Sequence, residues 1–225
     1  MKSKKNIIKY LLVFLLIIYY GFEAKDMQII DSLDFFKTYL DNFQKYLFMG
    51  TLITILLMPT KNNNYLNPEI KIRLSNNMFK YIWFKNIEEI IINTFFIIFS
   101  FVIISSFFGY NNPISIISFV SFMRIFLFML SCYVIRDFWY FVTGKNYVGY
   151  AVTVASNYLM LIVVISINYY FKTNTFTQES LLFILCIYEC IINIIGLIYL
   201  YINYNKKEII WLLIKKESMS KWKEK

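Results

Sequence analysis

The segment TKNNNYLNPEIKIRLSNNMFKYIWFKNI, residues 60–87, is the longest polar interruption in an otherwise apolar chain. Its first half is rich in asparagine and contains Pro68, and both residue types form turns and interrupt helices. From Ser75, a candidate N-cap, apolar, aromatic and basic residues recur at helical spacing. We therefore expect an irregular first half followed by a helix at a membrane surface, with its lysines reaching toward the lipid headgroups.

The composition is that of a membrane protein. Of the 225 residues, 59% are hydrophobic, with 23 Phe and 19 Tyr, which is more apolar surface than a soluble domain of this size can bury. The solvent for most of the chain is therefore expected to be lipid. The net charge of +9 does not indicate nucleic acid as a partner, because the charges lie between apolar runs, as they do on cytoplasmic faces of membrane proteins.

The apolar runs predict an all-α, polytopic integral membrane protein that forms a single transmembrane domain over residues 1–225. A cytoplasmic loop, residues 60–87, separates the second and third spans, and a basic tail, residues 202–225, follows the sixth. The tail contains EIIWLLI between lysines, which indicates either an interfacial helix on anionic lipid or a disordered basic end. The six expected transmembrane helices are residues 7–22, 43–58, 89–108, 114–135, 147–170 and 181–201.

The basic residues predict the orientation of these helices. Most of the 23 Lys and Arg lie in the N-terminal segment, the loop 60–87, the loop after the fourth span and the tail. Arg136 and Asp137 are assigned to that loop after the fourth span. Short loops rich in Lys and Arg remain in the cytoplasm. We therefore expect a multi-pass protein of the cell (plasma) membrane with both termini in the cytoplasm.

The residue types argue against catalysis in this chain. It contains no histidine, which excludes Ser-His and Cys-His catalysis and His-ligated zinc. Gly144-Lys145 is not a phosphate loop, because Trp139 stands where that motif needs a glycine. The three cysteines, which lie in apolar runs, are interpreted as apolar fillers rather than as metal or redox sites: Cys132, Cys186 and Cys190. We expect no catalytic, cofactor-binding or metal-binding residue, and no enzyme activity.

Two charged residues lie inside the apolar runs. Arg124 lies in SFMRIFLF of the fourth span and Glu189 in ILCIYECII of the sixth. Both spans are expected to run from outside to inside, and both residues fall near the middle of the membrane. A charge in hydrocarbon needs a partner, so we expect an intramembrane charge pair, direct or through one shared polar residue. The pair is either a structural link between helices or part of a transport or catalytic site.

The topology and the loop 60–87 together resemble a known family. Six spans with both ends inside and a long basic interfacial loop between spans two and three are similar to type-2 ABC transporter permeases, especially the small permease subunits of bacteriocin and lantibiotic export or self-immunity systems. The stretch NPEIKIRLSNNMFKYIWFKNI carries this resemblance. In that family the corresponding segment is a coupling helix that sits in a cleft of the ATPase subunit. The resemblance implies an ATPase-docking surface made by Asn77, Met78, Lys80, Tyr81, Trp83, Phe84 and Lys85.

Three functions remain as hypotheses. The first is a permease subunit that exports or clears a hydrophobic or amphipathic peptide, powered by a separate ATPase subunit that holds ATP and Mg; its further partners would be membrane lipid and a second copy or a related permease subunit. The second is a non-transporting immunity or assembly protein that binds a toxin or another membrane subunit, in which the loop rests only on lipid headgroups. The third, an intramembrane enzyme, lacks a nucleophile–base pair.

Overall fold

The computed structural model describes residues 2–26, 39, 42–58, 78–109, 119–143, 145–170, 181 and 183–203. Within these ranges the chain forms helices and no strand, which confirms the all-α class for the described residues. The helices are α1 (Lys2–Asp26), α3 (Phe43–Leu57), α5 (Met78–Phe107), α6 (Phe119–Thr143), α7 (Asn146–Tyr170) and a last helix over Phe183–Asn203.

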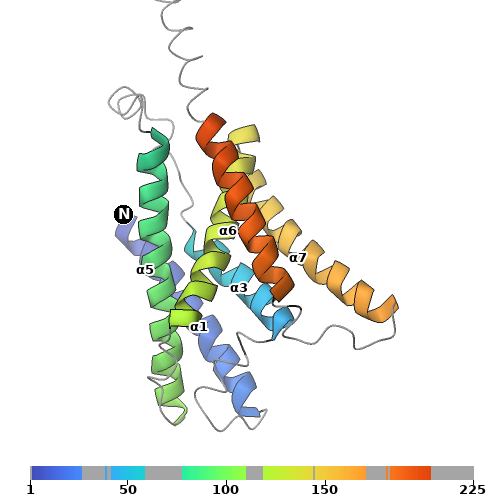
Figure 1. Ribbon diagram of the computed structural model, residues 1–225. Helices are drawn as coiled ribbons and strands as arrows, with labels where there is room; N and C mark the ends of the chain where they lie inside the picture. The colour runs from blue at the N-terminus through green and yellow to red at the C-terminus, as the bar shows by residue number, and fades with distance from the viewer. Residues whose placement is uncertain are drawn as a thin grey trace, which may run out of the picture.

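Successive helices run in opposite directions. In Figure 1, α1, α5 and α7 descend, whereas α3, α6 and the last helix ascend. Helix α6 lies at the centre of the arrangement and packs against α5, α7 and α3, while α1 packs against α3 and α5. This alternation brings the first turns of α5, the last turns of α6 and the end of the last helix to the same end of the bundle.

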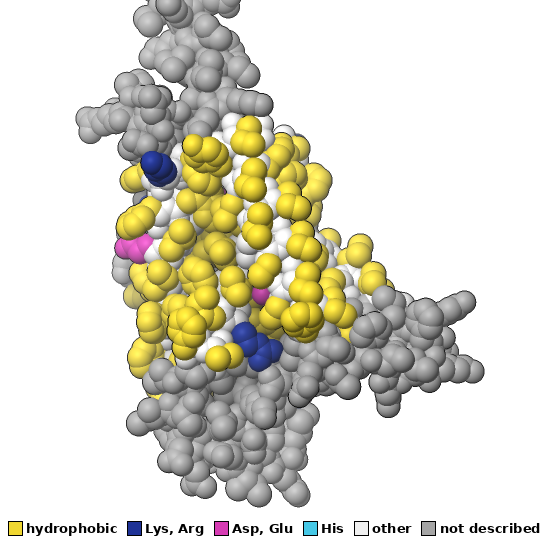
Figure 2. Space-filling view, in the orientation of Figure 1, with side chains coloured by type: hydrophobic (Ala, Val, Ile, Leu, Met, Phe, Trp, Pro, Cys, Tyr) yellow, Lys and Arg dark blue, Asp and Glu magenta, His cyan; other side chains and the backbone are white. Residues whose placement is uncertain are grey.

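The helices have the length and surface expected in lipid. Three of them, over Phe79–Phe107, Phe119–Thr143 and Phe183–Asn203, are long and apolar enough to cross a membrane. Large hydrophobic side chains are exposed along their outer faces, and Figure 2 shows such side chains covering most of the described surface on one face. Exposed apolar surface of this extent is rare on soluble monomers, so the protein is membrane-associated. The six spans and the cytoplasmic termini stay predictions.

Helix α5 corrects one expectation. Residues 78–85 were expected to form an interfacial helix separate from a span beginning at Glu89, but the structure has one continuous helix of 30 residues. The segment between them holds no proline or glycine, and the Asn86 side chain bonds to α6 instead of competing for the α5 backbone. At 1.5 Å per residue α5 is about 45 Å long, more than the roughly 30 Å of a bilayer's hydrocarbon core.

Helix α6 corrects the expected end of the fourth span. The fourth span was expected to end near Ile135, with Arg136 and Asp137 in the following loop, but α6 continues to Thr143. Both side chains are therefore inside the helical bundle, where they bind each other and a neighbouring helix. Helix α1 also begins earlier than expected, at Lys2. The irregular half of the loop, the Ser75 cap and the tail 204–225 lie outside the described residues.

Two hydrophobic clusters hold the helices together. The larger joins α1, α3, α5 and α6 through side chains such as Ile17, Leu47, Phe101 and Met129. The smaller cluster, which we call the α5-start cluster, consists of Ile82, Trp83, Val134 and Leu200, with Phe79, Tyr140 and Phe141 packed around them. It anchors the first turns of α5 to α6 and to the last helix.

Close contact between α6 and α7 depends on a glycine. A Cβ atom added at Gly149 would lie 2.5 Å from the carbonyl oxygen of Arg136, so the two helices would have to separate to accept a larger residue. We expect Gly149→Val to lower the free energy of unfolding by about 1–3 kcal/mol, the usual cost of overpacking. The thermal unfolding midpoint in detergent measures this loss. Ala151→Val, at an exposed position of α7, is the matched control, and equal midpoints for the two variants would contradict the close contact.

Candidate functional site

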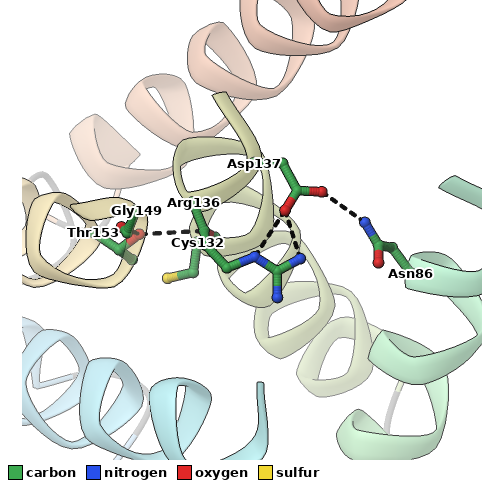
Figure 3. A network of polar contacts seen from close by, with 6 residues as sticks. All are labelled: Asn86, Cys132, Arg136, Asp137, Gly149 and Thr153. Carbon is green, nitrogen blue, oxygen red and sulfur yellow. Dashed lines mark hydrogen bonds and ion pairs between the residues drawn. The ribbon is translucent and has the colours of Figure 1, made fainter. Parts of the chain in front are cut away.

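The first polar site is a buried charge cluster between α5 and α6, here called the Asp137 cluster and made by Asn86, Arg136 and Asp137. Arg136 is 2% exposed and Asp137 is 1% exposed. The Arg136 Nε donates to Oδ1 of Asp137 at 2.8 Å, and its Nη2 lies 2.6 Å from the same oxygen. The Asn86 Nδ2 donates to the other carboxylate oxygen, Oδ2, at 2.8 Å, as Figure 3 shows. Both oxygens of the carboxylate are therefore occupied.

The surroundings of the cluster add a cation–π contact to Arg136 and hydrogen bonds of Thr153 beside it on the α7 side. The guanidinium carbon of Arg136 lies 4.5 Å from the centre of the Tyr133 ring, a cation–π distance. On the α7 side, the Thr153 hydroxyl donates to the carbonyl of Gly149 at 2.8 Å and lies 3.5 Å from the carbonyl oxygen of Cys132 (Figure 3). Charges removed from water are tolerated only when they are paired and hydrogen-bonded. The cluster meets that condition, so its chemistry is that of a structural link between helices.

A neutral contact links the middle of the bundle. The Asn157 side chain of α7 donates from Nδ2 to the Thr51 hydroxyl of α3 at 3.0 Å and lies 3.5 Å from the Cys132 sulfur of α6. Three helices thus share one amide group. The Asn86 side chain had no assigned role, because an asparagine at the end of a polar segment gives no indication of its partner.

The second polar site contains both residues of the expected intramembrane pair. Arg124 and Glu189 line one small cavity together with Tyr46, Leu185 and Cys186, and it has room for about one water molecule. The Tyr46 hydroxyl donates to the backbone carbonyl of Arg124 at 2.9 Å, and the Arg124 guanidinium carbon lies 5.8 Å from the centre of the Tyr46 ring. The structure thus brings the two charged residues to one place, with Tyr46 beside both. That they form a pair stays a prediction.

The expected docking residues divide between two faces of α5. Lys80, Tyr81, Phe84 and Lys85 are exposed, with Phe84 at 75%. Trp83 is only 4% exposed, because helical spacing turns it with Ile82 and Phe79 toward Val134 and Leu200 in the α5-start cluster. Its assignment to a docking surface is therefore corrected. Met78 begins α5, and its side chain and Asn77 lie outside what the structure describes.

The Asp137 cluster was missed because charges were taken as the mark of a loop. A signal for it existed: the sequence from Phe119 to Thr143 contains neither proline nor glycine, so nothing in it ends a helix at residue 135. If the helix continues past residue 135, Arg136 and Asp137 belong to α6 and not to the following loop. Elsewhere, no group of three or more His, Cys, Asp or Glu side chains among the described residues could hold a metal ion.

The Asp137 cluster gives a test of stability. Asp137→Ala leaves the Arg136 charge buried without its carboxylate and the Asn86 amide without its acceptor, so we expect the free energy of unfolding to fall by about 3–5 kcal/mol. Glu88→Ala, which removes an exposed carboxylate from α5, should change it by no more than about 0.5 kcal/mol. Equilibrium unfolding in detergent measures both. If the two variants unfold alike, the cluster does not hold α5 to α6.

No protein-family model, curated protein or solved structure matches this chain. The features of this chain that bear on a function are therefore the Asp137 cluster, the cavity lined by Arg124 and Glu189, and the exposed face at the start of α5.

Proposed function

We propose that the chain is the membrane-spanning permease subunit of an ABC transporter, with six spans and both termini in the cytoplasm, which exports or clears a hydrophobic or amphipathic peptide. A separate ATPase subunit would bind ATP and Mg²⁺ and supply the energy. The observation that carries the proposal is helix α5, which combines an exposed basic and aromatic face at its start with a continuous connection into the bundle.

The length of α5 favours a docking role for its first turns. A helix of 30 residues exceeds the hydrocarbon core by about ten residues, or roughly 15 Å. Apolar residues from Ile90 onward account for the part in lipid, which leaves the turns from Met78 to Glu89 outside it. There Lys80, Tyr81, Phe84 and Lys85 form one exposed face. Aromatic and basic side chains together are suited to a protein surface that carries negative charge.

The contacts of α5 favour transmission of movement from that face. The turn that exposes Phe84 also places Ile82 and Trp83 against Val134 of α6 and Leu200 of the last helix. One turn further, Asn86 is hydrogen-bonded to Asp137 of α6, and α6 itself packs on α3 and α7. A displacement of the exposed face by an ATPase would therefore move several helices at once. Packed interfaces shift between discrete arrangements rather than deform gradually, as alternating access requires.

The apolar outer surface of the last helix favours a hydrophobic substrate over a water-soluble one. Ile187, Ile191, Ile194 and Ile198 are all exposed on it, and they offer no polar group to a substrate. A peptide dissolved in the membrane could reach the bundle along such a surface without leaving lipid. A water-soluble substrate would need a polar entry instead.

Crosslinking tests the ATPase partner. In a background whose three cysteines are replaced by alanine, Phe84→Cys carries a photoreactive thiol reagent in membranes of the native cells, and mass spectrometry identifies the products. We expect Phe84→Cys to crosslink to an ATP-binding-cassette ATPase. Ile92→Cys, an exposed position two turns further along α5, should crosslink only to lipid or to other membrane segments. If both positions reach only lipid, the permease proposal fails and the non-transporting immunity or assembly protein takes its place.

Two neighbouring aromatic residues separate docking from stability. Phe84→Ala removes an exposed ring and should weaken association with the ATPase while leaving the thermal unfolding midpoint unchanged. Trp83→Ala removes a buried ring and should lower the free energy of unfolding by about 3–5 kcal/mol. Co-purification of the ATPase and the unfolding midpoint measure the two effects on the same samples. A loss of association without loss of stability in Trp83→Ala would contradict this division of the two faces.

A further inference from the structure

Glu189 lies in the bundle interior, and its carboxylate is not fully hydrogen-bonded by the residues that the structure describes. It is 3% exposed and lies about two turns into the last helix, which is long and apolar enough to cross a membrane. Among the described residues, none donates a hydrogen bond to its Oε1 atom. One turn further along the same helix, the buried amide of Asn193 also has no partner there on either side-chain atom. Glu189 thus differs from Asp137, whose two oxygens are both bonded.

An unsatisfied carboxylate at this depth is unfavourable. With no bulk water in the hydrocarbon region, an unsatisfied polar group is unfavourable and an ionised one is more so. A charge of this kind is stabilised by a counter-charge, by water or by a proton. The cavity beside Glu189 has room for about one water molecule, and a water molecule can act both as a hydrogen-bond partner and as a proton carrier.

The neighbours of Glu189 divide into one cation and several neutral groups. The titratable groups that face it are Tyr46 of α3, Arg124 and Cys132 of α6, and Cys186 and Tyr188 of its own helix. Tyr46 has a single O–H, and this donates to the Arg124 carbonyl, so it is not directed at Glu189. Arg124 is the one permanently charged group in this set.

The Arg124 guanidinium also lies near an aromatic ring that can stabilise its charge. Its guanidinium lies 5.8 Å from the centre of the Tyr46 ring, within range of a cation–π contact. An ionised Glu189 attracts Arg124 across the cavity, whereas a neutral Glu189 leaves Arg124 on the ring. Protonation of Glu189 would therefore weaken the electrostatic link between α6 and the last helix.

We propose that Glu189 is an exchangeable proton-binding site inside the membrane, with Arg124 as its counter-charge and the cavity water as its proton donor and acceptor. In this step a hydronium ion that reaches the cavity gives its proton to the carboxylate: one O–H bond of the hydronium breaks, one O–H bond of the carboxyl group forms, and a water molecule remains. The site is independent of the ATPase partner, because it is built entirely from α3, α6 and the last helix.

A hydrophobic carbodiimide tests the proposal. Dicyclohexylcarbodiimide reacts with a protonated carboxyl group: the carboxyl proton passes to a carbodiimide nitrogen, the carboxylate oxygen bonds to the central carbon, and the adduct rearranges to a stable N-acylurea with no leaving group. The full chain in lipid vesicles is treated over a range of pH, and the labelled peptides are quantified by mass spectrometry. The exposed Glu88 of α5 is the internal control for carboxylates in contact with water.

We expect Glu189 to be labelled and Glu88 to remain largely unlabelled. Labelling of Glu189 should fall as the pH rises, by about tenfold for each pH unit once its proton is lost. Arg124→Gln removes the counter-charge that favours the ionised form, so labelling in this variant should persist to higher pH. A shift in the opposite direction would exclude Arg124 as the counter-charge.

Infrared spectroscopy gives a second readout that does not depend on access of the reagent. The C=O stretch of a protonated carboxyl group should be present in the native chain and lost in Glu189→Gln. This band should shift when the sample is transferred to deuterium oxide, and its intensity should fall with rising pH as the labelling does. Absence of this band at every pH, together with no labelling of Glu189, would overturn the proposal and leave Glu189 as a permanently ionised partner of Arg124. Labelling that does not change with pH would overturn it as well.

Discussion

The Asp137 carboxylate is the contact on which the arrangement of this bundle depends. Its two oxygens bind groups from two helices, the Asn86 amide of α5 and the Arg136 guanidinium of α6. Because these groups are buried by protein, no bulk water replaces a lost partner, so this bond acts together with the α5-start cluster to set the rotation of α5 about its axis. That rotation directs Trp83 and Ile82 into the α5-start cluster and leaves Lys80, Tyr81, Phe84 and Lys85 on the outside. The exposed face proposed as a docking surface thus lies opposite the side of α5 that this hydrogen bond and the α5-start cluster hold against α6.

The two charged sites of the protein illustrate opposite solutions to the same physical problem. At Asp137 both carboxylate oxygens are bonded and the adjacent Arg136 balances the charge. At Glu189 one oxygen has no donor among the described residues, and a small cavity lies beside the side chain. A carboxylate whose two oxygens are both bonded stabilises one arrangement of the helices, whereas a carboxylate with an unbonded oxygen has room to accept a proton or a water molecule. Both sites use α6, which meets α5 at the Asp137 cluster and the last helix at Glu189.

Several features could be predicted from residue patterns because they depend on composition and local spacing. The all-α class and the second helix, expected at residues 43–58 and found at Phe43–Leu57, follow from apolar runs bounded by polar residues. The structure has one continuous helix α5 and an α6 that extends to Thr143, whereas a break before Glu89 and an end near Ile135 were expected. These expectations were wrong because lysines, glutamates and the Arg136-Asp137 pair were taken to mark the ends of spans. Charges mark an end only when they face water. Here Arg136 and Asp137 face each other and Asn86.

The sequence alone determined the solvent of this protein and the chemistry it lacks: a chain of 59% hydrophobic residues without histidine forms helices in lipid and has no histidine-based catalysis. Local spacing also determined that Lys80 and Phe84 share a helix face. Only the tertiary structure decided which face of α5 is buried, which partners satisfy Asp137, and that Arg124 and Glu189 line one cavity. The physical reason is that local propensity acts along one helix, whereas the satisfaction of a buried charge depends on groups brought from helices far apart in the chain.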